Sequence, residues 1–355
     1  MVLPFWHSVS GGRCPLRRVI TVALVLGLLA AGCGGSSTPA PPASATAAAS
    51  AKPSPVALKV SYSNTIGDYL PLFIAKDAGI FAENGIETDP VMIASAQGIA
   101  AVVSGEVNVA MLGGSEILSA AAQGADLVIV AVIGNTYPFI FEAAPGIKTP
   151  ADLKGKKIGV STIGSSSDIA TRVALRKLGI DPEKDVTIVA VGSADQRTAA
   201  MLSGAIQGGV TLVPDNLVVE EKGFTPLFNL AELKLPAAQT VVTMQRSFLT
   251  SRRDLAQRVV DSIVLAIVRE QKDRPFAIAT LKKWLKVDDQ KKLDATYDFY
   301  AKSFHTPLPY PKAEQFADSK TQLGATNAKV RDYDLSKLLD ESLVKSAADR
   351  GLDKK

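Results

Sequence analysis

Three consecutive serines, Ser165 to Ser167, stand between a predicted strand at residues 157–160 and a predicted helix at residues 168–178. Such a junction points backbone N–H groups and the positive end of a helix dipole at one spot. It can therefore hold an anion or a carbonyl oxygen. The three hydroxyls would add hydrogen-bond donors without adding charge, so these residues are a candidate site for the polar group of a ligand.

The same residues also have a purely local explanation. Ser165 followed three residues later by Asp168 is a capping box, in which side chains satisfy the free N–H groups of the helix without a ligand. Short capping motifs occur in many helices, and the motif alone supports both interpretations about equally. Whether Ser165 caps the helix or contacts a ligand stays open at this point.

Strands and helices alternate along the chain, which predicts an α/β fold with a parallel or mixed sheet. Strands are expected at residues 58–61, 85–93, 107–112 and 127–133, and helices at residues 70–78, 96–104 and 116–123. Residues 97–124 and 196–223, offset by 99 positions, share seven identities over 28 positions and the same helix–Ser-Gly–strand layout. These features predict two similar α/β lobes.

Two extended stretches should connect the lobes. Residues 136–144 leave the first lobe and residues 239–244 return to it, so lobe one comprises residues 56–137 and 241–355 and lobe two comprises residues 139–240. Two adjacent connections form a hinge, and the cleft between the lobes is a natural ligand site. The chain then becomes helical, with a capping box expected at Ser251 and Asp254, and these extra helices are assigned to lobe one.

Residues 1–32 have the features of a bacterial lipoprotein signal peptide. Three arginines precede the apolar residues 19–31, a run too short to span a bilayer. The run ends in Ala-Ala-Gly before Cys33, which resembles a lipobox, with Ala30 in place of the usual leucine. We expect Cys33 to be diacylated and to anchor the protein. A plain secretory signal and a buried structural cysteine are the alternatives. Residues 33–55 are predicted to form a disordered tether.

Charge and composition exclude several classes of function. The formal net charge of +4 falls to +1 (4 − 3) without the three arginines of the signal peptide, which argues against nucleic-acid binding. Removal of residues 1–32 leaves one histidine, His305, and one cysteine, Cys33. Zinc sites, Ser–His–Asp triads and Cys–His pairs need more partners than these. We expect no metal, no cofactor and no hydrolase activity.

Residues 58–310 resemble periplasmic substrate-binding proteins of ABC importers, and among them the NMT1/THI5-like branch, which includes nitrate, taurine and sulfonate binders. The resemblance rests on the segments AKDAGIF (residues 75–81), SGEVNVA (104–110), TPADLKGKKIGV (149–160) and AMLSG (200–204). It implies a bilobal type II periplasmic-binding-protein fold with two crossovers. It also implies a monomer, periplasmic or on the cell surface, that delivers a small molecule to a permease and meets the membrane only through its lipid anchor.

The resemblance also implies which loops contact the ligand, each at a strand end or a helix start. The expected contact residues are Ser63, Asn64, Thr65, Gln97, Gly114, Ser115, Asn135, Thr136, Tyr137, Ser165, Ser166, Ser167, Arg197 and Asp215. Helix capping is an equal alternative for Gln97 and Ser115, a turn for Asn135, and packing for Tyr137. Arg197 is the basic residue of these loops and the candidate counter-ion of an acidic ligand, although an arginine at a helix start is usually solvated.

These loops suit sulfonates, carboxylates, aromatic acids and heterocycles about equally. The implied ligand is therefore a small molecule that is anionic or a polar aromatic or heterocyclic compound. A related branch makes the thiamine pyrimidine and needs histidines and iron near its cleft, whereas His305 falls in the C-terminal helices. An enzyme of that branch is one alternative and a ligand-sensing adaptor is another. Neighbouring permease and ATPase genes would favour import.

Overall fold

The computed structural model describes residues 55–355. The predicted signal peptide, the lipidation site at Cys33 and nearly all of the predicted tether lie outside these residues. No helix within the described part of the chain combines the length and the apolar character needed to cross a membrane.

The first five-stranded sheet has the order β4-β2-β5-β12-β6. Its strands are β2 (Val60–Tyr62), β4 (Val91–Met92), β5 (Val109–Leu112), β6 (Leu127–Thr136) and β12 (Pro236–Gln245). Strands β2, β4 and β5 are parallel, and β12 lies antiparallel between β5 and β6. The connecting helices are α1 (Leu70–Asp77), α2 (Ile80–Glu83), α3 (Ser95–Ser104) and α4 (Gly114–Ala122), and β1 (Val56–Ala57) pairs separately with β3 (Ile86–Glu87).

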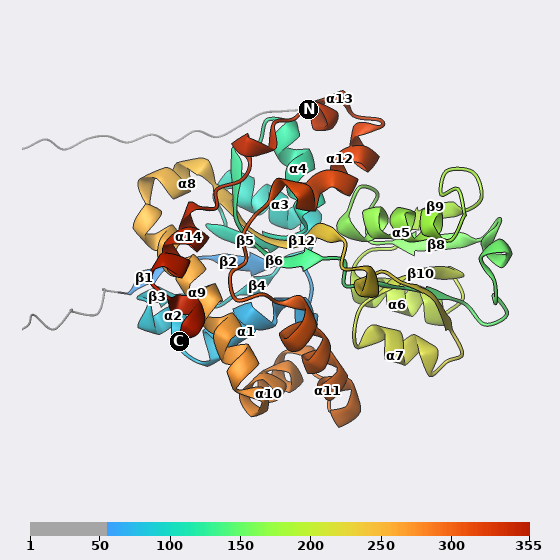
Figure 1. The fold of residues 1–355 in the computed structure, drawn as a ribbon, viewed down its shortest axis with the longest axis horizontal. Coiled ribbons are helices and arrows are strands. Elements are labelled where there is room, and N and C mark those ends of the chain that lie inside the picture. The colour runs from blue at the N-terminus through green and yellow to red at the C-terminus, as the bar shows by residue number, and fades with distance from the viewer. Residues whose placement is uncertain (1–54) are drawn as a thin grey trace, which may run out of the picture. The chain divides into compact units, whose positions relative to one another are not determined.

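The second five-stranded sheet has the order β11-β7-β10-β8-β9. It contains β7 (Ile140–Ala143), β8 (Lys157–Val160), β9 (Thr187–Ala190), β10 (Gly208–Thr211) and β11 (Thr225–Asn229), with helices α5 (Ser166–Lys177), α6 (Ala194–Leu202) and α7 (Asp215–Glu220). Strands β8, β9 and β10 are parallel and β7 is antiparallel to β10. Figure 1 shows this sheet in green, beside the first.

The chain passes between the two sheets twice, between β6 and β7 and between β11 and β12. The two connections run next to each other, because Leu230 N donates to Phe139 O at 2.9 Å and Pro236 pairs with Thr136. Strand β12 thus joins the first sheet from Pro236 onward. The predicted bilobal α/β fold is confirmed.

The C-terminal part of the chain is helical. It comprises α8 (Arg246–Ser251), α9 (Arg253–Lys272), α10 (Arg274–Leu285), α11 (Gln290–Phe299), α12 (Ala317–Gly324), α13 (Ala328–Arg331) and α14 (Ser342–Asp349). Helix α9 buries Leu255, Val259, Ile263 and Ile267, spaced four residues apart, and packs on α1 and α14. Helix α12 also touches the second lobe, because Arg176 of α5 donates to Gln322 at 2.5 Å.

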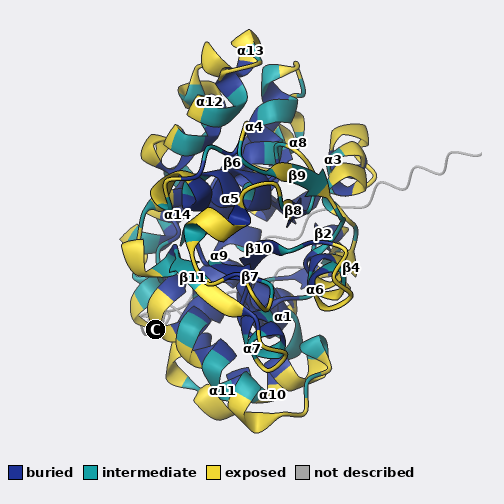
Figure 2. Ribbon diagram, turned by 90° about the vertical axis from the view of Figure 1, so that its right-hand side faces the viewer, coloured by how far each residue is buried: buried dark blue, intermediate teal, exposed yellow. Residues whose placement is uncertain are grey.

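Buried residues concentrate in the central strands and in the helix faces that cover them, and exposed residues lie on the outer helices (Figure 2). Strand β6 is the last strand of its sheet, yet its residues 127–133 are all buried. The C-terminal part of the chain covers its outer edge, where Ile129 N donates to Leu338 O at 2.8 Å and Val132 N donates to Pro309 O at 2.9 Å. The sequence signal for this strand, a continuous run of apolar residues, was correspondingly strong.

Two predictions about local structure are wrong, the single strand at residues 85–93 and the cap at Ser251. Residues 85–93 form two short strands in different sheets instead of one, since Pro90 lacks an N–H and Lys76 Nζ donates to Thr88 O at 2.7 Å. Ser251 caps no helix, because its hydroxyl donates back to Ser247 O at 2.8 Å and α9 has no side-chain cap. The predicted helices at residues 116–123 and 168–178 are present as α4 and α5, and each begins two residues earlier than predicted.

Candidate ligand-binding site

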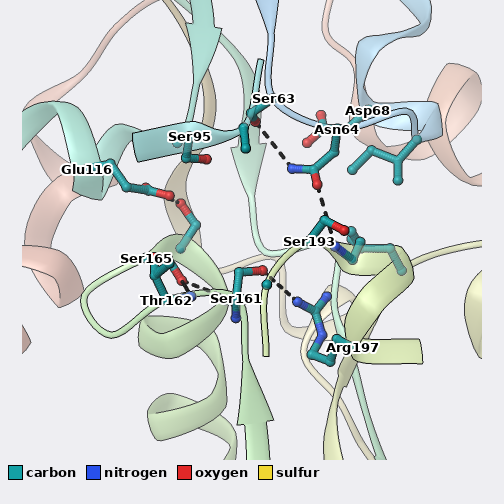
Figure 3. A pocket seen from close by; sticks show the side chains of 18 of the residues that line it. Ser63, Asn64, Asp68, Ser95, Glu116, Ser161, Thr162, Ser165, Ser193 and Arg197 are labelled. Carbon is teal, nitrogen blue, oxygen red and sulfur yellow. Dashed lines mark hydrogen bonds between the residues drawn. The ribbon is translucent and has the colours of Figure 1, made fainter. Parts of the chain in front are cut away.

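A cavity of about 280 Å³ is lined by residues from both lobes. Its volume is near the lower end of the range that small-molecule sites usually occupy, about 300 Å³ upward. The polar side chains on its wall are Ser63, Asn64, Asp68, Ser95, Gln97, Glu116, Ser161, Thr162, Ser165, Ser166, Ser167, Ser193, Gln196, Arg197, Gln239 and Thr240. Figure 3 shows several of these side chains facing one another across the cavity.

Four helices present their N-terminal ends to this cavity. From lobe one these are α3, through Ser95 to Gln97, and α4, through Gly113 and Glu116. From lobe two they are α5, through residues 165–167, and α6, through residues 193–197. The N-terminal N–H groups of a helix have no partners within it and carry the positive end of the dipole. The cavity is therefore suited to hydrogen-bond acceptors.

Two of the three serines hold the local structure, and the third faces the other lobe. Ser165 is the N-cap of α5, where its Oγ accepts from Asp168 N at 3.4 Å, and Asp168 accepts from Gly164 N at 2.8 Å. Ser167 Oγ accepts from Ser161 N at 2.9 Å and lies 2.9 Å from Ser165 Oγ. Ser165 and Ser167 therefore stabilise the loop that leads into α5. Ser166 points instead toward lobe one.

Glu116 faces the start of α5 from the first turn of α4. Ser115 Oγ donates to Glu116 Oε2 at 2.7 Å, and Ser166 Oγ donates to the same oxygen at 3.2 Å. Burial raises the pKa of the Glu116 carboxyl above its usual range, although these hydroxyls and the nearby backbone N–H groups act in the opposite direction. A carboxyl group thus occupies the end of the cavity where the serine run had suggested an anion site.

Arg197 is only 2% exposed, so the expectation of a solvated arginine is wrong. Its Nε donates to Val210 O at 2.6 Å and its Nη1 donates to Ser161 Oγ at 2.8 Å. Burial lowers the pKa of Arg197 to about 10, against the opposite effect of Asp215 and Asp195, so the guanidinium is charged at neutral pH. It supplies a positive charge to the cavity wall.

The lobe-one wall around η1 (Gly67–Tyr69) is tightly hydrogen-bonded. Ser63 Oγ lies 2.6 Å from Tyr69 Oη, and Thr240 Oγ1 donates to Asp68 Oδ2 at 2.5 Å. Behind Asp68 lies the fully buried His305, whose Nε2 is 3.2 Å from Asp68 O and whose Nδ1 is 2.9 Å from Glu270 Oε1. Thr240 belongs to β12, so this network ties the connecting strand to the wall.

The structure brings about half of the expected contact residues to this cavity. Ser63, Asn64, Gln97, Ser165, Ser166, Ser167 and Arg197 all line it. Thr65 and Asp215 line a second cavity of about 510 Å³ beside Trp284, where burial raises the pKa of Asp215 and Thr198 donates to it at 3.1 Å.

The other expected residues are not on the cavity wall. Gly114 and the buried Ser115 lie immediately behind Gly113, and a Cβ on Gly114 would meet Ala238. Asn135 and Thr136 end β6, and the buried Tyr137 follows them. Tyr137 Oη donates to Asp318 of α12 at 3.0 Å, so in this arrangement it joins the connection between the lobes to the C-terminal helices.

Several wall residues had not been identified in the sequence, chiefly Glu116, Asp68, Ser95 and Ser193. Ser193 could have been found, because Ser193 and Gln196 form a capping box at the start of α6. Glu116 carried no such signal, since an acidic residue in the first turn usually serves its own helix dipole. No group of three or more His, Cys, Asp or Glu side chains in residues 55–355 is arranged to hold a metal ion.

Comparison with known proteins places this arrangement in a family. A family described as "NMT1/THI5 like" matches residues 67–267, more than half of the 355 residues. The chain belongs to the NMT1/THI5-like family. The matched region of this NMT1/THI5-like protein contains α3, α4, α5 and α6, the four helices whose N-terminal ends line the cavity.

Individual relatives are distant. A Brucella abortus protein to which a binding function is assigned provisionally is 31% identical over 117 residues, which is 33% of this chain and 35% of the relative's length. The match therefore spans about a third of that curated relative. The periplasmic aliphatic sulphonate binding protein SsuA from Escherichia coli is 24% identical, with a TM-score of 0.63 over 81% of this chain and 93% of that one. The periplasmic nitrate-binding protein NrtA from Synechocystis is 16% identical, with a TM-score of 0.66 over 83% and 89%. These two structures show the shared fold.

Proposed function

We propose that this protein is an extracytoplasmic solute-binding protein that captures a small molecule between its lobes and delivers it to an ABC import permease. The observation that carries the proposal is the single cavity at which four helix N-termini from both lobes meet. A ligand bound there contacts both lobes at once, and it therefore favours their closed arrangement. The sulphonate- and nitrate-binding proteins of the same fold support this role.

The ligand that fits this cavity is small, with a group that accepts hydrogen bonds. On lobe two the donors are the guanidinium of Arg197 and the N-terminal N–H groups of α5 and α6. On lobe one they are the amide of Asn64 and the N-terminal N–H groups of α3. An acid or a polar heterocycle offers the matching acceptors. Binding without chemical conversion is favoured because His305 is buried behind Asp68 and is absent from the residues that line the cavity.

The proposed location follows from the N-terminal sequence. Cleavage before Cys33 and acylation of that residue would leave residues 33–55 as a tether between the membrane surface and the folded lobes. The protein would then act as a monomer on the outer side of the cytoplasmic membrane or in the periplasm, where it can reach a permease.

A thermal-shift screen tests the proposal directly. The panel contains sulfonates, carboxylates, aromatic acids and neutral heterocycles, and a ligand at a hundredfold excess over its Kd should stabilise the protein by about 2.7 kcal/mol. Calorimetry should then give one site per chain. If no compound of the panel raises the melting temperature or binds in calorimetry, the proposed function is wrong for these ligand classes.

Two variants of cavity residues test whether a ligand found in the screen binds in this cavity. Asn64→Ala and Arg197→Gln should each weaken binding about tenfold or more, because each removes a donor to a polar or charged group. Arg252→Gln changes an exposed arginine at the start of α9 and serves as the matched control. Equal affinities for the wild type, both cavity variants and the control would place the ligand elsewhere.

A further inference from the structure

Glu116 lies at one end of the cavity, and one of its carboxylate oxygens has no side-chain partner among residues 55–355. Both hydroxyl contacts, from Ser115 at 2.7 Å and from Ser166 at 3.2 Å, go to Oε2. Oε1 accepts no side-chain hydrogen bond from the residues that the structure describes, and it is not enclosed by protein atoms. The backbone N–H groups of Glu116 and Ser166 also act on the carboxyl. Glu116 itself is among the residues that line the cavity. Its second oxygen is therefore available to a hydrogen-bond donor within the cavity.

The position of Glu116 works against an anion at the start of α5. Its carboxylate already receives the hydroxyl of Ser166, while Ser165 and Ser167 bond to each other and to the loop. A second negative group placed there would face a carboxylate at close range in a partly buried site. Burial raises the pKa of Glu116, so the ionised carboxylate in the empty cavity lacks the solvation that it would have in water. A donor from the ligand would compensate for this loss.

Positive charge lies on the other side of the cavity. Figure 3 shows Arg197 at the side opposite Glu116, beside Ser161. Arg197 uses Nε and Nη1 for Val210 O and Ser161 Oγ, and no residue in the described part of the chain bonds to Nη2. The cavity is thus polarised, with an acceptor end at Glu116 and a donor end at Arg197.

We propose that Glu116 is a specificity residue, and that the cavity prefers small acids that also carry an N–H or O–H donor away from the acidic group. The acidic group lies toward Arg197 and the amino or hydroxyl group donates to Glu116 Oε1. This inference rests on the proposed binding function and narrows its ligand class. Acids that lack the donor leave Glu116 Oε1 without a ligand partner in a partly buried site, and an unpaired polar atom of this kind discriminates strongly between related ligands.

Matched pairs of compounds test the donor requirement on the wild-type protein. Each pair differs by replacing the donor with a methyl group of similar size: 4-aminobenzenesulfonate with toluene-4-sulfonate, 4-hydroxybenzoate with 4-methylbenzoate, and 2-aminoethanesulfonate with propane-1-sulfonate. Calorimetric Kd values at one pH and salt concentration give the preference within each pair. For at least one pair the donor-bearing acid should bind about tenfold or more tightly.

Glu116→Gln tests the residue. Glutamine keeps the size of the side chain but removes the charge, so the preference within that pair should fall to about threefold or less, with the loss mostly in the affinity of the donor-bearing acid. Glu106→Gln makes the same chemical change at an exposed glutamate outside the cavity and should keep the wild-type preference. Thermal melts of both variants check that they are folded.

The outcomes separate this inference from the proposed function. Equal binding of both members of every pair, or an unchanged preference in Glu116→Gln, overturns the role of Glu116 and leaves the binding function intact. Binding of neutral heterocycles alone, with no acid bound, also overturns it while supporting the binding function. A preference for the donor-bearing acid that is lost in Glu116→Gln and kept in Glu106→Gln supports it. The wild-type measurements decide the ligand class even if Glu116→Gln proves unstable.

Discussion

The buried pair of His305 and Glu270 should make the stability of this protein depend on pH above neutrality. His305 Nδ1 lies 2.9 Å from Glu270 Oε1, its Nε2 lies 3.2 Å from Asp68 O, and both side chains are inaccessible to solvent. Burial alone would lower the pKa of His305. The Glu270 carboxylate and the interactions with Asp68 together outweigh burial and raise that pKa to about 9.

The sign and the size of the effect follow from linkage. The pKa of His305 is about 9 in the folded protein, against 6.5 for an unperturbed histidine. The proton is thus bound more tightly in the folded state, so its stabilisation is fully present below pH 6.5 and is lost as the pH rises toward 9. At about 1.4 kcal/mol per pKa unit, the shift corresponds to roughly 3 kcal/mol. That is a large share of a typical unfolding free energy of about 5–15 kcal/mol.

Urea denaturation at intervals from pH 6 to pH 10 measures this loss. Over that range the unfolding free energy of the wild type should fall, and the fall should be about 3 kcal/mol larger than in Glu270→Gln. That variant lacks the carboxylate partner of His305. Other titrating groups are shared by the two proteins and cancel in the difference between them. Glu106→Gln, at an exposed position, should follow the wild type. A difference between the wild type and Glu270→Gln that stays constant within about 0.5 kcal/mol would refute the assignment of a charged His305.

Three further predictions concern other parts of the chain. Ser165→Ala should lower the unfolding free energy by about 1 kcal/mol in urea melts, since Ser165 caps α5, whereas Ser166→Ala should change it less and alter ligand affinity instead. Burial, followed by Glu220, raises the pKa of Glu142 to about 8. The folded state therefore holds this proton more tightly, and its contribution to wild-type stability should decline from about pH 5 to pH 8. Glu142→Gln should reduce that decline in the unfolding free energy by roughly 1–3 kcal/mol. Cys33→Ser should release the protein from the membrane fraction, and unchanged detergent-dependent association would rule out the anchor.

The fold could be predicted from the sequence largely because its strands are apolar runs separated by amphipathic helices. Strand β6, nearly all branched aliphatic residues, and the repeated Ser-Gly after α3 and α6 are local signals. The prediction failed at residues 85–93, where the chain changes from one sheet to another within a few residues. Which sheet each short strand joins depends on the strands that lie beside it in the folded protein. The pattern of apolar residues within the segment does not contain this information.

Arg197 shows why burial of a charged residue is hard to predict. An arginine at the start of a helix is ordinarily solvated, yet this one is enclosed because residues of strands β8 and β10 leave space for it. A Cβ on Gly209 would lie 3.5 Å from Arg197 Cδ and 2.9 Å from Gly159 O. The carbonyl of Val210 and the hydroxyl of Ser161 replace the lost water. Each feature is visible in the sequence, but only the pairing of the strands brings them to one place.

Both apolar and polar contacts join the lobes in this arrangement. Val213 of lobe two lies in one buried cluster with Tyr300 and Phe304 of the C-terminal part of the chain. Gln322 of α12 accepts from Arg176, Lys292 donates to Glu221 at 3.1 Å, and Glu116 meets Ser166 inside the cavity. The two exposed pairs, Arg176 with Gln322 and Lys292 with Glu221, contribute only about 0–1 kcal/mol each. A ligand shifts the equilibrium between open and closed lobes only by its difference in affinity for the two states. Since the cavity wall belongs to both lobes, a ligand gains its full set of contacts in the closed state alone, and that difference in affinity shifts the lobes toward closure.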